Sequence, residues 1–286
     1  MTELVQENYI DELRVAVDVA REAGAAILGF YRGPLKVEQK YDRDDREPVT
    51  QADRIANELI VERLRSEFPH DGMLAEESLD TTHRLEKCRV WMVDPLDGTT
   101  GFIAGNGDFA VQIGLSEAGK SVLGVVYQPL TDVLYRAVQG GGAWVERPAQ
   151  PPQRATTSAR TDLHSMRLAA SRSHRSPRMD QVVKALGVKE EVRRGSVGIK
   201  IGLIIEQQCD FYIHLSPRTK QWDTCAPEVI LTEAGGKLSD LFGRPLRYNL
   251  LEVQNRNGIV ASNGASHVLI IKALAPLLAK FQRQPV

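Results

Sequence analysis

The sequence has little of several residue types that mark particular classes of protein. Cysteine occurs only three times, at Cys88, Cys209 and Cys225, with none of the spacings of a metal-binding knuckle, so we expect a reducing compartment. Aromatic residues make up 6% of the chain, and the formal net charge is −1. The chain therefore lacks the basic face with interleaved aromatic residues that would draw it to nucleic acid, and no basic field would draw it to an anionic membrane.

Long apolar runs are also missing. The most apolar stretch, residues 267–281, covers about 15 residues, contains Lys272, Pro276 and Lys280, and is too short to span a bilayer. The N-terminal residues are acidic and lack the pattern of a signal peptide. We therefore expect a cytoplasmic protein without a membrane span, in which residues 267–281 form a helix packed on the core.

What the sequence does have is an ordinary globular composition, with 42% hydrophobic and 26% charged residues. A chain of 286 residues is long for one core and sufficient for two lobes. Residues 148–161 are rich in Pro, Gln, Arg, Thr and Ser and have no apolar period. We therefore predict a first lobe at residues 1–155 and a second lobe at residues 156–286.

Apolar periodicity predicts the elements of both lobes. The first half is predicted to contain a helix over residues 4–31, a solvated charged loop at 40–47, a helix opened by residues 48–53, strands at 73–75 and 90–93, and an antiparallel meander over 109–145. The second half alternates strands at 167–170, 210–215, 237–241 and 258–262 with helices at 179–186, after residue 196 and from residue 222.

The chain is organised around residues 90–102. The apolar residues 90–93 predict a buried strand that ends at Asp94, because the proline that follows cannot continue a central strand. Asp97 comes three residues later, and Gly98 and Thr99 are typical of a turn that starts a helix. Ligands bind at such strand ends, and backbone N–H groups there receive phosphate. Because two carboxylates would repel a phosphate, this stretch predicts a phosphate bridged by a metal ion.

Three further acids occupy comparable positions. Glu76 ends a short apolar strand, Asp223 opens a helix, and Asp53 follows Thr50 by three residues at the start of another helix. Each has an ordinary explanation, respectively a surface carboxylate, a helix N-cap and a capping box. Because Glu76 and Glu77 would point to opposite faces of an extended chain, at most one of them is expected to face a site.

Together these acids suit a hard cation. Mg²⁺ prefers oxygen ligands, and the Leu96 carbonyl between Asp94 and Asp97 adds one more. Two such ions could clamp a phosphate and activate a bound water. The hydroxyl of Thr99 could orient that water, and Asp53 could accept the hydrogen bond of the hydroxyl if it faces the same site.

Four segments in a fixed order now carry a resemblance: Pro-Val-Thr-Gln-Ala-Asp at 48–53, Glu-Glu-Ser at 76–78, Asp-Pro-Leu-Asp-Gly-Thr at 94–99 and Trp-Asp-Thr-Cys-Ala-Pro-Glu at 222–228. The chain resembles the Mg²⁺-dependent, lithium-sensitive phosphatase superfamily that includes inositol monophosphatases, fructose 1,6-bisphosphatases and 3′(2′),5′-bisphosphate nucleotidases. The resemblance covers nearly the whole chain. It implies a mixed α/β (α+β) fold with five layers in the order α-β-α-β-α, and an assembly state of monomer or homodimer.

The resemblance also implies roles for individual residues. The ligands of two or three Mg²⁺ ions would be Glu76, Asp94, the Leu96 carbonyl, Asp97 and Asp223. The phosphate-binding amides would be those of Gly98 and Thr99, and Thr99 with Asp53 would activate the attacking water. The metal and phosphate residues would also border a small phosphorylated substrate.

The substrate is less sharply indicated. Residues 106–109, 171–174 and 222–231 look like the nucleotidase branch, as does Ser196 followed by Lys200. That branch implies adenosine 3′,5′-bisphosphate, an intermediate of sulfur metabolism, with Lys200, Ser196 and His174 holding the second phosphate or the ribose. The ordinary alternatives are a solvated helix lysine for Lys200 and an ordinary loop histidine for His174.

One departure keeps other substrates open. After Gly98 and Thr99 many nucleotidases show a lysine and then an acid, whereas this chain has Thr100 and Gly101, which is closer to inositol monophosphatases. An inositol monophosphatase or another sugar-phosphate phosphatase is therefore the alternative. A catalytically silent protein that senses a metal or ligand is a third hypothesis, disfavoured because the acids and Thr99 all occur together.

Overall fold

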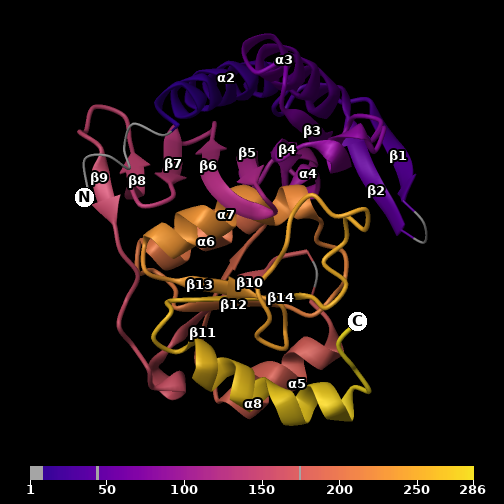
Figure 1. Ribbon diagram of the computed structural model, residues 1–286. Coiled ribbons are helices and arrows are strands. Elements are labelled where there is room, and N and C mark those ends of the chain that lie inside the picture. Colours follow the sequence, from indigo (N-terminus) through magenta and orange to yellow (C-terminus); the bar gives the residue numbers. More distant parts are fainter. Residues whose placement is uncertain (1–8, 43–44, 174) are drawn as a thin grey trace.

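The computed structural model describes residues 9–42, 45–173 and 175–286. Its helices and sheets alternate in five layers (Figure 1), which confirms the predicted mixed α/β architecture. The outer helical layer is α2 (Ile10–Leu28) with α3 (Gln51–Glu67), the middle one is α6 (Val197–Ile205) with α7 (Gln221–Glu233), and the last one is α5 (Pro177–Leu186) with α8 (His267–Lys280). The two larger sheets, of seven and five strands, lie between these layers.

The larger sheet has seven strands in the order β3-β4-β5-β6-β7-β8-β9. Their bounds are β3 (Gly72–Ala75), β4 (Arg89–Asp97), β5 (Ala110–Glu117), β6 (Lys120–Gln128), β7 (Val133–Val138), β8 (Gly142–Glu146) and β9 (Gln153–Ala155). Only β3 and β4 run parallel, so the predicted antiparallel meander is confirmed. Within residues 148–161, for which the sequence shows no apolar period, the three residues of β9 pair with β8.

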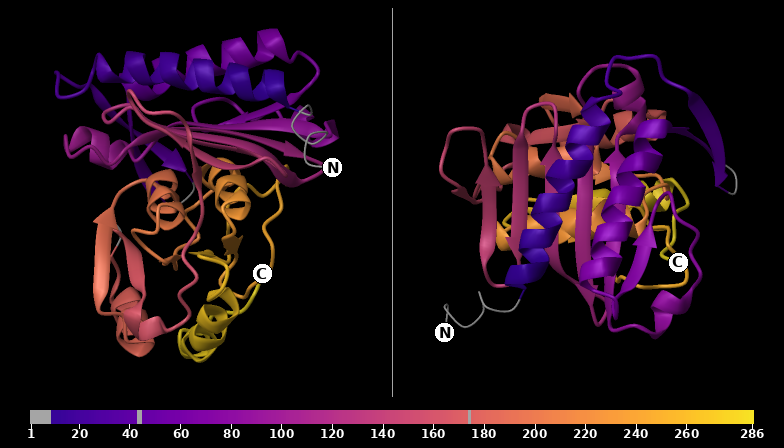
Figure 2. Two further views of the ribbon diagram at one scale, coloured as in Figure 1. Left: turned by 90° about the vertical axis from the view of Figure 1, so that its left-hand side faces the viewer. Right: turned by 90° about the horizontal axis from the view of Figure 1, so that it is seen from above.

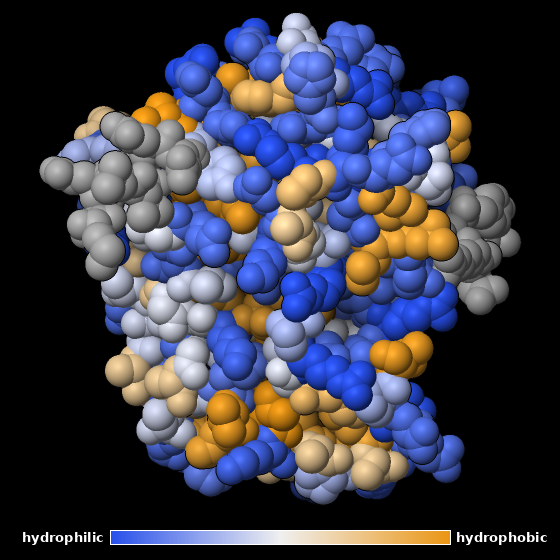
Figure 3. Space-filling model, in the orientation of Figure 1, coloured by the Kyte–Doolittle hydropathy of each residue, from blue (hydrophilic) through white to orange (hydrophobic). Residues whose placement is uncertain are grey.

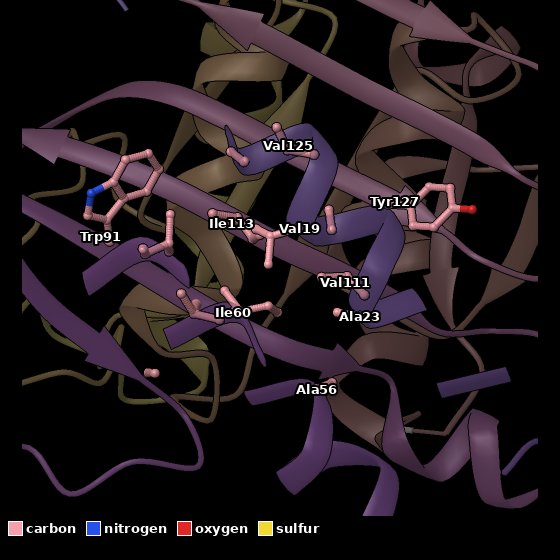
Figure 4. Packing of buried hydrophobic residues seen from close by; sticks show 14 of the residues in the cluster. Val19, Ala23, Ala56, Ile60, Trp91, Val111, Ile113, Val125 and Tyr127 are labelled. Atoms are coloured by element: carbon pink, nitrogen blue, oxygen red, sulfur yellow. The ribbon is translucent and has the colours of Figure 1, made fainter. Parts of the chain in front are cut away.

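Two helices cover the outer face of this sheet, lying side by side (Figure 2). Figure 4 shows their apolar side chains against those of the strands: Val19 and Ala23 from α2 and Ile60 from α3 lie over Val111 and Ile113 of β5. All five are buried, and burial of such side chains is the main favourable term in folding. The apolar residues that recur along α2 therefore form the face of the helix that packs on the sheet, as predicted.

The bounds of that first helix differ from the prediction. Of the predicted residues 4–31, those at 4–8 lie outside the described residues, and the helix ends at Leu28. Beyond it Phe30 and Tyr31 bond to the carbonyls three residues earlier, at Ile27 and Leu28, so the chain tightens into a turn before Gly33.

The smaller sheet has five strands in the order β11-β10-β12-β14-β13. They are β10 (Arg167–Ser171), β11 (Glu190–Arg194), β12 (Phe211–His214), β13 (Lys237–Ser239) and β14 (Ile259–Ser262). Strand β11 was not predicted, because four of its five residues are charged and it pairs with a neighbour on one side only. The division of the chain into lobes at residue 155 stays a prediction.

A hairpin lies where a solvated loop was expected. Strands β1 (Val37–Asp42) and β2 (Asp45–Thr50) pair antiparallel in a separate two-stranded sheet. The prediction for residues 40–47 was wrong because backbone pairing, which needs no apolar alternation, forms this hairpin. The remaining short elements are the helix α4 (Thr99–Ile103) and the 3₁₀ turns η1 (His83–Glu86) and η2 (Leu163–Ser165).

The last helix lies where the sequence predicted it. In α8 the side chains of Ile270, Leu274 and Leu278 are buried against the smaller sheet and α5, whereas Val268 and Leu269 are exposed. Figure 3 shows apolar side chains among polar ones in the region of α5 and α8. Across the described residues, none of the helices combines the length and apolar character needed to cross a membrane.

Candidate active site

The strand β4 continues past its proline. It was predicted to end at Asp94, but it runs to Asp97 with a register shift between the two acids. The reason is that β3 pairs with β4 only as far as Val93, so the rest of β4 has a neighbour on one side. A proline fits such a half-open strand because its missing N–H can face the unpaired side. The two aspartates consequently flank a bulge at the edge of the larger sheet.

A cavity of about 250 Å³ opens at this edge and collects most of the predicted site residues. Those that line it are Glu76, Asp94, Asp97, Gly98, Thr99, Ser196, Lys200 and Asp223. Leu96 is buried between two of them, and Asp53 is buried behind Thr99. His174 lies outside the described residues. The fold therefore brings residues from both sheets and both halves of the chain to one place.

Asp53 serves both the helix and the site. Its Oδ2 accepts hydrogen bonds from the backbone N–H of Thr50 (2.7 Å) and from the Thr50 hydroxyl (2.6 Å), which confirms the predicted capping box. Its Oδ1 accepts the hydroxyl of Thr99 at 3.0 Å. Burial raises the pKa of Asp53, an effect that the two Thr50 bonds oppose. The structural and the functional interpretation of this residue hold together because each uses a different oxygen.

Two of the clustered carboxyls are strongly perturbed. Burial raises the pKa of Asp94 well above its usual range, and the charges of Glu76, Asp97 and Asp223 add to that effect. Burial, again with its acidic neighbours, raises the pKa of Asp223 to about 8. Buried like charges disfavour one another, so a bound cation would relieve the cost of ionising these groups.

Asp97 lies in a different environment, surrounded by hydrogen-bond donors. Its Oδ2 accepts from Gln112 Nε2 at 2.6 Å, from the Ser196 hydroxyl at 2.5 Å and from the Gly198 N–H at 3.0 Å. Burial raises the pKa of Asp97, while Lys200 and these bonds to Ser196 and Gly198 act against that rise. Gln112 was not predicted as a site residue, since its only signal is an amide within the apolar part of β5.

Lys40, in the hairpin, also escaped the sequence analysis. Its Nζ lies 2.6 Å from Glu76 Oε1 and also contacts Glu77. Burial lowers the pKa of Lys40, but the two carboxylates outweigh burial and raise it above its ordinary value. The expectation that at most one of the two glutamates would face the site holds for this cavity, since Glu76 lines it and Glu77 is not among its lining residues. The opposite orientation expected of an extended chain does not apply, because both lie in the turn after β3 and reach the same ammonium group.

The donor set fits a hard divalent cation in its chemistry. It consists of carboxylates and the Leu96 carbonyl, the kind of oxygen ligands that Mg²⁺ and Ca²⁺ take. In the described residues, no three acidic, histidine or cysteine side chains are arranged to hold an ion as they stand. Their oxygens accept bonds from the protein instead, such as Leu96 N on Asp94 Oδ1 (3.0 Å) and Lys220 N on Asp223 Oδ2 (2.7 Å). An ion at Glu76 Oε1 would compete with Lys40.

A buried cation also lines the cavity. Lys200 is 3% exposed, donates to the carbonyl of Ser196 and lies 4.8 Å from the centre of the Tyr212 ring. The alternative of a solvated helix lysine is therefore wrong. Burial lowers the pKa of Lys200 to about 8, and the charges of Asp97 and Asp108 limit the decrease. The ammonium form therefore persists near neutral pH.

A second cavity of about 380 Å³ adjoins the first. The two share Ser171, Ser173, His214 and Arg218. Only the loop that contains Ser171 and Ser173 was predicted from the sequence to contact a substrate, since His214 and Arg218 belong to no recognisable motif. The joined space is open to a ligand longer than a single phosphorylated ring.

Comparison with known proteins agrees with this arrangement. The chain is 38% identical over 237 residues to the 3′(2′),5′-bisphosphate nucleotidase CysQ of Salmonella typhimurium, covering 82% of this chain and 93% of that protein. It is 32% identical over 270 residues to the inositol-1-monophosphatase of Bacillus subtilis, covering 93% and 97%.

Solved structures show the same fold. CysQ from Bacteroides thetaiotaomicron has a TM-score of 0.75 at 32% identity and covers 90% of this chain and 98% of its own. An IMPase of Thermotoga maritima has a TM-score of 0.80 at 24% identity and covers 95% and 99%, a likeness of fold alone. The sequence model of the inositol monophosphatase family matches residues 10–279. The chain therefore belongs to the inositol monophosphatase family.

Proposed function

We propose that this protein is a Mg²⁺-dependent phosphomonoesterase that hydrolyses the 3′-phosphate of adenosine 3′,5′-bisphosphate to give AMP and phosphate. The observation that carries the proposal is one cavity lined both by a group of acidic residues and by the buried ammonium of Lys200. Identity of 38% to a protein named as a 3′(2′),5′-bisphosphate nucleotidase supports the same choice. A substrate with two phosphate groups needs positive charge at two separate places.

In this proposal the metal ions are held by Glu76, Asp94, the Leu96 carbonyl, Asp97 and Asp223. Bound Mg²⁺ supplies positive charge to the phosphate and lowers the pKa of a coordinated water. The backbone N–H groups of Gly98 and Thr99 are proposed to bind the oxygens of the phosphate that is removed, at the turn where β4 meets α4.

Thr99 and Asp53 form the proposed proton relay. The Thr99 hydroxyl donates to Asp53 Oδ1, so its oxygen is free to accept a hydrogen bond from the attacking water. As the water attacks phosphorus, its proton passes to Thr99 while the Thr99 proton passes to Asp53. Burial raises the pKa of Asp53, which makes its carboxylate a better proton acceptor than an exposed aspartate.

Lys200 and the second cavity are proposed to hold the remainder of the substrate. Ser196 anchors Lys200 through its carbonyl and Asp97 through its hydroxyl, so the ammonium has a fixed place relative to the acids. The adjoining 380 Å³ offers space for a nucleoside and its second phosphate. His174 belongs to the proposed substrate-binding set, although it lies outside the described residues.

The second candidate is an inositol or sugar-phosphate phosphatase. It is favoured by Thr100 and Gly101 after the motif and by 32% identity to a protein named inositol-1-monophosphatase. The deciding experiment compares kcat/KM for adenosine 3′,5′-bisphosphate, inositol 1-phosphate and fructose 1,6-bisphosphate at saturating Mg²⁺. We expect the bisphosphate nucleotide to have the highest value and chelation of the metal to abolish turnover. A higher value for either sugar phosphate would assign the second candidate, and binding of Mg²⁺ and phosphate without turnover would point to a silent sensing protein.

A further inference from the structure

A buried aspartate outside the catalytic cavity joins the two sheets. Asp108 lies in the loop between α4 and β5 of the larger sheet and is 1% exposed. Its carboxylate accepts from Arg194 Nε at 2.5 Å and from the Gly195 N–H at 2.8 Å, both at the end of β11, and pairs with Arg172 Nε at 2.6 Å. Asp108 is not among the residues that line the cavity, so the proposed reaction leaves it without a role.

The partners of Asp108 lead directly to the turn before α6. Ser196 begins that helix with φ +55°, a left-handed conformation that is costly for a residue with a side chain. Two carboxylates hold the turn from the larger sheet. Asp108 binds its Gly195 N–H, and Asp97 accepts from the Ser196 hydroxyl and the Gly198 N–H. These hydrogen bonds from outside the helix stabilise the strained backbone of the turn.

Close packing leaves the turn little freedom to move away. A Cβ atom at Gly195 would lie 2.8 Å from the Cβ of Asp108, and one at Gly98 would lie 2.3 Å from the Asp108 carbonyl oxygen. The same short loop is thus packed against the proposed phosphate-binding turn and against the start of α6. Because Lys200 bonds to the Ser196 carbonyl one helical turn along α6, the position of this turn also sets the position of the ammonium.

We propose that Asp108 is a positioning residue for substrate selection. By anchoring the start of α6 to the larger sheet, it sets the distance between Lys200 and the acids at the end of β4. The protein can then favour a substrate whose second anionic group lies at that distance from the phosphate that is removed. This inference rests on the proposed function and names the residue that enforces its preference for a bisphosphate.

The test compares two nucleotides that lose a phosphate from the same ribose 3′-oxygen: adenosine 3′,5′-bisphosphate and adenosine 3′-monophosphate. Asp108→Asn keeps the size of the side chain but removes the charge that holds Arg172 and Arg194. We expect its KM for the bisphosphate to rise by about tenfold or more while kcat/KM for the monophosphate changes by less than about threefold. Asp108→Glu, which keeps the charge, should recover part of the preference.

Glu206 supplies a matched control. It follows α6 at its other end and accepts from Tyr135 Oη at 2.6 Å and from Arg147, both in the region of the larger sheet. Glu206→Gln removes an ionic anchor at the end of the same helix that lies away from the Ser196 turn. We expect it to lower the melting temperature without changing the ratio of the two kcat/KM values. If Asp108→Asn does not fold, Arg194→Met tests the same anchor, since the Arg194 side chain is 31% exposed.

The outcomes separate the two proposals. A selective loss with Asp108→Asn or Arg194→Met, absent from Glu206→Gln, supports the positioning role. Equal losses on both nucleotides, or the same selective loss in Glu206→Gln, would overturn it. Wild-type protein that hydrolyses neither nucleotide would refute the proposed function itself, whatever the variants do.

Discussion

Replacing Asp53 by asparagine should separate catalysis from stability. Asparagine has the same shape but one acceptor oxygen, which can stay with the Thr50 N–H and hydroxyl now bonded at 2.7 and 2.6 Å. The new amide N–H₂ then faces Thr99, whose hydroxyl proton can turn to the Leu96 carbonyl, already at 3.2 Å. Every hydrogen-bonding group at the site keeps a partner, so the free energy of unfolding should fall by only about 1 kcal/mol.

Activity should respond very differently. With an amide at position 53, Thr99 has no carboxylate to receive its proton, and kcat should fall by roughly 10²- to 10⁴-fold. Stability is measured by urea unfolding and activity by phosphate release at saturating Mg²⁺. Asp240→Asn is the matched control, because Asp240 is a buried carboxylate that accepts two backbone N–H groups, from Phe242 and Arg244, outside both cavities.

Two results would refute the reasoning about Asp53. One is an Asp53→Asn protein that keeps kcat within about threefold of wild type. The other is an equal loss of kcat in Asp240→Asn, which would show that activity follows general stability and not the relay.

Three further predictions concern charge. Burial and acidic neighbours raise the pKa of the Asp94 carboxyl, so its charged form destabilises the protein when no metal is bound. Asp94→Asn should therefore unfold at the same or a higher temperature than wild type without Mg²⁺, but should lose both its stabilisation by Mg²⁺ and its turnover. An Asp94→Asn variant that turns over normally would contradict this. Lys200→Met should lower kcat/KM for adenosine 3′,5′-bisphosphate by about tenfold or more and that for adenosine 3′-monophosphate far less, and equal effects would contradict it. Burial lowers the pKa of His267 from 6.5 to about 4, so between these values the unfolded chain takes up a proton that the folded protein refuses. The free energy of unfolding should therefore fall by roughly 2–3 kcal/mol as the pH drops from about 6.5 to 4, measured by urea unfolding, and His267→Gln should remove that part of the pH dependence.

The sequence predicted best those features that a single segment specifies. The apolar faces of α2 and α3 and the Thr50–Asp53 capping box are each encoded within one turn or one helix, and the structure has them. The layered fold was predicted from the family resemblance that the four motifs carry in their order along the chain. The bulge after Val93 escaped prediction, since it depends on where the neighbouring β3 stops.

What the sequence could not predict depends on contacts between distant residues. Lys40 reaches Glu76 from a charged hairpin, and Asp108 reaches Gly195 across 87 positions of the chain. The residues next to Lys40 and Asp108 in the sequence do not indicate that either side chain is buried or which charged group it contacts. The strand β11 shows the same limitation, because its charged residues are held by backbone pairing to β10. Only the assembled sheets determine which of these charged groups become internal.

Three aspartates, Asp97 and Asp223 in the cavity and Asp53 behind it, use their two oxygens for different purposes. In Asp53 one oxygen completes the helix cap and the other receives Thr99; in Asp97 all three of the closest donors act on Oδ2; in Asp223 the Lys220 N–H also takes Oδ2. One oxygen of each is committed to the backbone or to a neighbouring helix, so the carboxylate is aimed before any ligand arrives. Removing the whole group should therefore damage the fold and the site together, whereas an amide can keep the structural bond and lose only the charge. For this reason aspartate-to-asparagine variants, and not alanine variants, can tell the chemistry of this cavity apart from its architecture.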